Sequence, residues 1–210
     1  MSASCMFVSK NLPYPLSSGV TVGSGMTLKI KKDPSVMGPV EISHTNEYAS
    51  YAHRRLFLVD GGTLEMEGVT LNGGFSSSRT AGGGGGGGAV KVYNGGTASF
   101  VTVTFTQNYA YYRGGGAVYD SGGAASFVTC TFSENTVRGS EADGGAVFVV
   151  NTDTSTGTAS FVTCTFSRNS ASKSYDRSEN TTGCGNGGAV YIDSGTASFV
   201  TCKFSENAAT

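Results

Sequence analysis

The sequence is poor in the residues that build helices and in charge of either sign. Charged residues make up 14% of its 210 residues, Pro occurs 4 times and Trp is absent, whereas Gly occurs 32 times. Because few residues are good helix formers, we expect an all-β chain. The formal net charge of −1 gives no field that would concentrate nucleic acid or an anionic membrane. Neither is an expected partner.

Long apolar runs are also missing. No stretch of about 18 apolar residues occurs, so we expect no membrane-spanning helix. The first 19 residues have neither the basic start nor the continuous apolar segment of a signal peptide. We treat residues 1–18 as an N-terminal segment or possible cap, and residues 19–210 as the array described next.

The sequence does contain a two-part phrase that occurs four times. The first part, Gly-Gly-Ala-Val, begins at Gly87, Gly115, Gly144 and Gly187. The second part, Ala-Ser-Phe-Val-Thr-x-x-Phe-x-x-Asn, begins at Ala98, Ala125, Ala159 and Ala197. Successive copies of the second part are 27, 34 and 38 residues apart, so the extra residues must loop out. A constant phrase at intervals of about 20 to 50 residues is typical of a solenoid.

Two earlier segments extend this array. Leu64 to Asn72 matches the second part of the phrase in its apolar pattern, and apolar residues alternate with polar ones between Gly19 and Ile42. The sequence therefore predicts a parallel β-helix of about six coils with looped-out insertions. No cap follows Asn207, so we expect either continuation of the array or end-to-end association of chains.

Alternation along each strand predicts which side chains point inward. We expect one ladder of Phe (Phe105, Phe132, Phe166 and Phe204), one of core thiols (Cys130, Cys164 and Cys202) and one of Asn at a turn (Asn108, Asn135, Asn169 and Asn207). Cys5 and Cys184 lie outside these columns, and no cysteine has metal-ligand spacing. Asp120 also falls on an inward position. A buried unpaired carboxylate is costly, so we expect Asp120 to end the strand early at the Ser121-Gly-Gly turn; a slip of that coil is the alternative.

The alternation of Gly-Gly-Ala-Val with Phe-x-x-Asn from Gly87 to Asn207 resembles the repeats of the chlamydial polymorphic outer membrane proteins. The resemblance implies a right-handed β-helix, a location outside the cell or on its surface, and a role in adhesion. It implies no enzymatic activity.

An aromatic column is the first candidate binding face. Tyr119, Phe148 and Tyr191 each follow an inward valine, so they should point outward, where aromatic rings stack on sugars or on a protein partner. The alternative is that the insertions at 136–143 or 170–186 fold over these rings. The leading hypothesis is a non-catalytic structural or adhesive module that binds a glycan or protein through this face.

Pairs of threonines form a second candidate face. They are Thr102 and Thr104, Thr129 and Thr131, and Thr163 and Thr165. Two Thr on one side of each strand, repeated about every 4.8 Å along the stack, resemble the Thr-x-Thr arrays of β-helical ice-binding proteins. Lys203 interrupts the column in the last coil, and Thr is also simply a good strand former.

Enzymatic β-helices are the third possibility, because Asn151-Thr152-Asp153 resembles the first acidic motif of polygalacturonases. The further acidic, His and Arg partners needed for lyase or hydrolase chemistry do not accompany it, and His44 and His53 precede the regular coils. An Asx turn explains the motif more simply. We therefore expect no enzyme, no cofactor and no metal.

Overall fold

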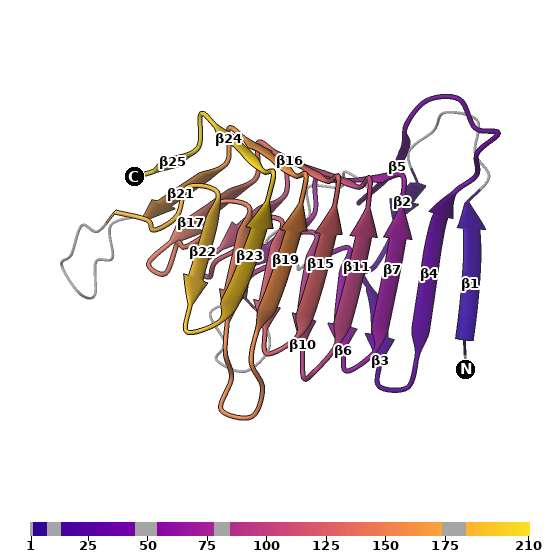
Figure 1. Cartoon of the computed structure of the whole chain (residues 1–210), viewed down its shortest axis with the longest axis horizontal. Helices are drawn as coiled ribbons and strands as arrows, with labels where there is room; N and C mark the ends of the chain where they lie inside the picture. Colours follow the sequence, from indigo (N-terminus) through magenta and orange to yellow (C-terminus); the bar gives the residue numbers. More distant parts are fainter. Residues whose placement is uncertain (1, 8–13, 45–53, 78–84, 174–183) are drawn as a thin grey trace.

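The computed structural model describes residues 2–7, 14–44, 54–77, 85–173 and 184–210, and in these ranges the chain forms a parallel β-helix (Figure 1). The coils stack along the long axis from the indigo N-terminal strands to the yellow C-terminal ones, so the two termini lie at opposite ends. Across the described ranges we find no helix that is long and apolar enough to cross a membrane.

Four parallel sheets run along the stack. Sheet A contains β1 (Ser2–Phe7), β4 (Thr27–Lys32), β7 (Thr63–Glu67), β11 (Thr97–Val101), β15 (Ala124–Val128), β19 (Thr158–Val162) and β23 (Thr196–Val200). Sheet B contains β2 (Tyr14–Leu16), β5 (Val40–His44), β8 (Val69–Asn72), β12 (Thr104–Thr106), β16 (Thr131–Ser133), β20 (Thr165–Ser167) and β24 (Lys203–Ser205). Sheet C contains β3 (Val20–Gly23), β6 (Phe57–Asp60), β10 (Val90–Tyr93), β14 (Val118–Ser121), β18 (Val147–Val150) and β22 (Val190–Asp193). Sheet D contains β9 (Phe75–Ser77), β13 (Tyr109–Tyr111), β17 (Thr136–Gly139), β21 (Ser170–Lys173) and β25 (Ala208–Ala209).

The predicted coils are confirmed, because sheet C is made of six strands. The two parts of the phrase occupy fixed places: Gly-Gly-Ala-Val leads into sheet C, and Ala-Ser-Phe-Val-Thr forms the sheet A strand and the corner that follows it. The stack also begins earlier than residue 19. Strands β1 and β2 pair in parallel with β4 and β5, so they add a further rung to sheets A and B.

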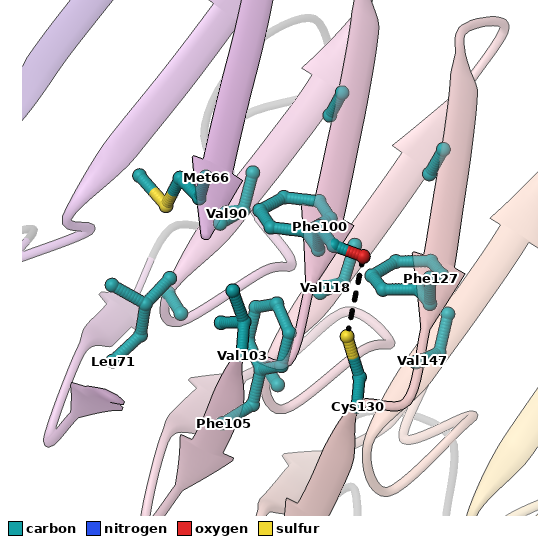
Figure 2. Packing of buried hydrophobic residues seen from close by; sticks show 14 of the residues in the cluster. Met66, Leu71, Val90, Phe100, Val103, Phe105, Val118, Phe127, Cys130 and Val147 are labelled. Carbon is teal, nitrogen blue, oxygen red and sulfur yellow. Dashed lines mark hydrogen bonds between the residues drawn. The ribbon is translucent and has the colours of Figure 1, made fainter. Parts of the chain in front are cut away.

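Stacked phenylalanines fill the core, as predicted (Figure 2). Phe127 lies on Phe100 with ring centroids 5.1 Å apart and planes 8° apart, and Phe132 lies on Phe105 at 4.7 Å and 2°. Within a coil, Phe100 and Phe105 meet edge to face at 5.1 Å. All four side chains are fully buried. Each offset contact is worth about 0.5 to 1.5 kcal/mol beyond the apolar area it buries.

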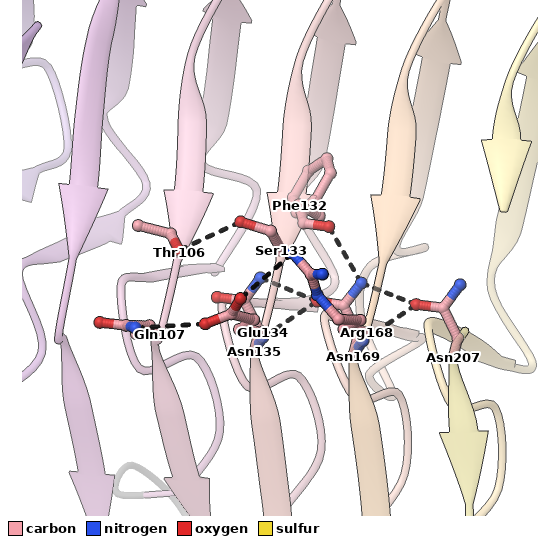
Figure 3. Close-up of polar contacts among 9 residues, drawn as sticks. All are labelled: Thr106, Gln107, Phe132, Ser133, Glu134, Asn135, Arg168, Asn169 and Asn207. Carbon is pink, nitrogen blue, oxygen red and sulfur yellow. Dashed lines mark hydrogen bonds and ion pairs between the residues drawn. The ribbon is translucent and has the colours of Figure 1, made fainter. Parts of the chain in front are cut away.

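The predicted asparagine ladder is also present (Figure 3). The Asn135 side-chain amide donates to the carbonyl of Phe105 at 3.0 Å and to Oδ1 of Asn169 at 2.9 Å. Asn108 and Asn169 repeat the pattern in the neighbouring coils. Each amide thereby satisfies backbone groups at a buried turn that has no strand partner for them.

Candidate functional site

The aromatic column on sheet C is covered rather than exposed. Tyr119 and Phe148 are only 5% and 8% exposed, while Tyr191 in the last coil is partly exposed. Their rings follow one another at 5.4 Å. The expectation of an outward binding face is therefore wrong for Tyr119 and Phe148, because other parts of the chain cover both rings.

Glycine backbone provides part of this cover. A Cβ on Gly86 would come within 2.6 Å of the Tyr119 ring, and one on Gly114 within 2.4 Å of the Phe148 ring. Contacts this short are not tolerated, so only glycine lets the chain lie directly on each ring. Gly86 belongs to the run of glycines from Gly82 to Gly88 in the sequence.

Two buried basic residues, Lys91 and Arg55, lie in the same region. Lys91 occupies the rung below Tyr119 and is 6% exposed, and its Nζ lies 5.3 Å from the Tyr119 ring centroid and 5.1 Å from that of Tyr93. Burial lowers the pKa of Lys91 to about 8, and the charge of Arg55 acts in the same direction. Arg55 donates to the carbonyls of Gly87 at 3.0 Å and Gly86 at 2.8 Å, so it holds the covering segment in place.

The predicted threonine pairs do not lie along single strands. Thr102, Thr129 and Thr163 occupy the corner between sheets A and B with φ of 54°, 56° and 58°. Their predicted partners Thr104, Thr131 and Thr165 begin the sheet B strands beyond that corner. Each pair therefore joins a corner residue to the first residue of a strand. All six side chains are exposed or partly exposed, with a buried Val or Cys between the two threonines.

A more regular face lies on the outside of sheet A, which faces the viewer in Figure 1 with no described segment crossing it. Its outward side chains form three columns: Thr97, Ala124, Thr158 and Thr196; Ser99, Ser126, Ser160 and Ser198; and Val101, Val128, Val162 and Val200. The valines are 38% to 54% exposed. The first two columns line a shallow groove of about 610 Å³.

Charge is confined to the N-terminal part of this face. Lys29 pairs with Glu65 at 2.9 Å and Lys31 with Glu67 at 2.6 Å, whereas β11, β15, β19 and β23 carry no ionisable side chain. The face was readable in the sequence, because it consists of the outward positions of the same repeated phrase.

A second exposed feature, on sheet D, was missed in the sequence. Phe75 and Tyr109 stack with centroids 5.5 Å apart, Tyr111 lies 6.5 Å from Tyr109, and Tyr112 meets Tyr111 edge to face at 4.3 Å. All four rings are partly exposed. The signal was the run Tyr-Ala-Tyr directly after Asn108, in which Ala points inward and both tyrosines outward.

The cysteine column is reduced, with Cys130 and Cys164 buried and Cys202 half-buried. Cys130 and Cys164 each donate a thiol hydrogen bond at 3.4 Å to a Phe carbonyl in the coil below, as Figure 2 shows for Cys130 and Phe100. Hydrogen bonding to Cys164 and burial raise the pKa of Cys130. Cys202 and the exposed Cys184 are also free. The side chain of Cys5 lies outside the described residues. The expected core thiols are confirmed for the column.

The strand does not end early at Asp120, contrary to expectation. Strand β14 continues through it to Ser121, and the carboxyl is fully buried between Val92 and Val149 in the neighbouring strands. Its Oδ1 accepts the Gly123 N–H at 2.8 Å, while Oδ2 has no hydrogen-bond partner among the described residues. Burial raises the pKa of Asp120 to about 7. The coil therefore accommodates this carboxyl in its protonated form at mildly acidic pH.

The motif at Asn151 holds a loop together. Its Oδ1 accepts the Gly157 N–H at 3.0 Å and its Nδ2 donates to the Ser194 carbonyl, while Asp153 is exposed. The loop joins β18 to β19 and projects from the stack in Figure 1. Within the described ranges no three His, Cys, Asp or Glu side chains are placed to hold a metal ion, and His53 lies outside those ranges.

We compared the chain with known proteins. No family model, curated protein or solved structure matches it. The chemistry of its own surfaces therefore carries the functional proposal.

Proposed function

We propose that this chain is a non-catalytic adhesive β-helix module, located outside the cell or on its surface, that binds an extended glycan or protein partner through the outer face of sheet A. The observation that supports it is the set of three in-register columns over β11, β15, β19 and β23. The resemblance to polymorphic outer membrane protein repeats supports the adhesive role and the location.

The regular spacing of side chains on the outer face of sheet A suits this face to an extended partner. Like side chains recur about every 4.8 Å along the stack, and outward side chains are about 6.8 Å apart along each strand. A ligand with a repeating unit can therefore make the same contact on successive coils. The groove lining contains Thr, Ser and Ala, with Glu65 as its ionisable member. One carboxylate does not provide an acid and base pair, which supports binding without catalysis.

Charge placed on this face tests the proposal. Ser126→Glu combined with Ser160→Glu puts two carboxylates in the middle column, and Ser133→Glu combined with Ser167→Glu puts them on the half-buried outer side of sheet B as a matched control. We expect the sheet A pair to abolish binding to a glycan array or to whole cells, and the control to retain it. Equal binding by both variants would show that sheet A is not the binding face.

Ice is the second candidate ligand, on sheet A rather than on the threonine pairs. The uncharged rows of Thr, Ser and exposed Val favour it, because such a surface orders water without binding it strongly through charge. Thermal hysteresis and ice-crystal shape measure it directly. Absence of both in the unaltered chain, or their persistence in the Ser126→Glu and Ser160→Glu variant, would exclude ice.

The C-terminal face of the stack is a separate contact surface. Phe199 and Phe204, which continue the buried Phe columns, are 40% and 51% exposed there beside a hollow of about 490 Å³. A further coil would cover them, whether it belongs to the same polypeptide or to a second copy.

A further inference from the structure

Sheet D presents a surface that the proposed role of sheet A leaves unused. Its outward positions form two adjacent columns, because inward Ala110 and Val137 alternate with outward residues. One column holds Phe75, Tyr109, Thr136 and Ser170, and the other holds Ser77, Tyr111, Arg138 and Ser172. Aromatic rings thus occupy the lower rungs, and a guanidinium and hydroxyl groups occupy the upper ones.

Arg138 is the charged member of this surface. It stands directly above Tyr111 in the strand register, is exposed, and forms no ion pair among the described residues. Burial raises the pKa of the Tyr109 phenol and the positive charge of Arg138 opposes the rise, so the guanidinium lies within electrostatic reach of this ring. Arg113, two residues after Tyr111, is by contrast paired with Glu141 at 3.0 Å.

This combination defines the chemistry of a ligand. Partly exposed aromatic rings offer apolar faces for the C–H groups of a sugar ring, while a planar guanidinium pairs best with a carboxylate through two parallel hydrogen bonds. Serine and threonine hydroxyls can both donate to and accept from sugar hydroxyls. A partner that is apolar on one face, rich in hydroxyls and negatively charged satisfies all three groups.

We propose that the sheet D surface formed by Phe75, Tyr109, Tyr111 and Arg138 binds an acidic polysaccharide that carries carboxylates, with the sugar rings on the aromatic rungs and a uronate carboxylate at Arg138. This surface shares no strand with sheet A, so it stands or falls independently of the proposed sheet A function. Nucleic acid is a different anionic partner, but one exposed guanidinium supplies little of the phosphate neutralisation that its binding needs.

Matched ligands test the role of charge. An oligogalacturonate and its fully methyl-esterified form have the same backbone and differ in the carboxylate charge. We expect calorimetric titration of the unaltered chain to show binding of the acid that is about tenfold or more tighter than binding of the ester, because a hydrogen bond to a charged group is lost in the ester. Equal affinities, no binding of either, or tighter binding of single-stranded DNA or dextran sulfate would overturn the proposal.

Matched variants test the location. Arg138→Gln should remove the preference for the acid, whereas Arg168→Gln, which loses the same charge from a residue paired with Glu134 at the corner between sheets B and D, should keep it. Tyr111→Ser should weaken binding of acid and ester alike by about threefold or more. Tyr111→Leu keeps the apolar bulk if the serine variant folds poorly. Equal losses in Arg138→Gln and Arg168→Gln would refute the site.

Discussion

Oδ1 of Asn169 accepts two hydrogen bonds from Asn135 in the coil below, one from its backbone N–H at 3.0 Å and one from its side-chain amide at 2.9 Å. The Asn side chain of each coil thus holds the turn of the coil below it. Asn135 in turn accepts from the backbone and side chain of Asn108 at 3.1 and 3.0 Å, so the ladder links successive coils through a single residue type.

We expect Asn135→Ala to lower the free energy of unfolding by about 3 kcal/mol, because it leaves a buried N–H of Asn108 and the buried carbonyl of Phe105 without partners. Chemical denaturation measures this. Ser133→Ala is the control, since it removes a half-buried hydrogen bond to Thr106 at 3.1 Å and should cost under about 1 kcal/mol. Similar losses in both variants would mean that the ladder does not stabilise the stack.

Asp120 should make stability depend on pH. Its pKa rises from 3.8 to about 7 on folding, so the folded state holds the proton more tightly, and stability is full below about pH 4 and falls as pH rises towards 7. The loss is on the order of 4 kcal/mol as an upper limit. Asp120→Asn should remove this component from thermal melts at pH 4 to 8. The exposed Asp153→Asn should leave it in place; identical pH profiles for Asp120→Asn and the unaltered chain would contradict the assignment.

Alanine substitution at Gly86 and at Gly95 tests whether Gly86 covers the Tyr119 ring, because the backbone strain should be similar at the two positions. Both have positive φ, 78° and 70°, but a Cβ on Gly86 would strike the Tyr119 ring, whereas one on Gly95 meets nothing within 4 Å. Both alanine variants should lose about 1 kcal/mol to the left-handed backbone. We expect Gly86→Ala to lose about 1 to 3 kcal/mol more from overpacking, measured by thermal or chemical unfolding. Equal losses would show that Tyr119 is not tightly covered.

Cys130 should be replaceable by valine, the residue that precedes it in the same column as Val103. The change adds about one methyl group at a column position where Val103 already fits, and removes weak thiol hydrogen bonds to the Phe100 and Val128 carbonyls. We therefore expect stability to change by less than about 1 kcal/mol. A thiol titration in denaturant should find all 5 cysteines reduced. Fewer free thiols, or a loss of several kcal/mol in Cys130→Val, would indicate a bond or role beyond packing.

The repeated phrase by itself determined the coil stack and the Phe, Cys and Asn ladders. These features follow from strand alternation and from a constant phrase, both of which are local properties of the chain. The outward Ser and Val columns of sheet A were equally present in the phrase.

Only the tertiary structure decided which outward residues meet solvent. Alternation shows the side to which Tyr119 points. Its cover, however, comes from Gly86, which lies between β9 and β10 in the preceding coil. The same holds for Asp120, which the Gly123 N–H and the valines of two neighbouring coils accommodate. The corner within each threonine pair is a further case: the left-handed φ at Thr102 turns the chain between sheets A and B, and such corners are set by the packing of the whole coil rather than by the residue's own preference.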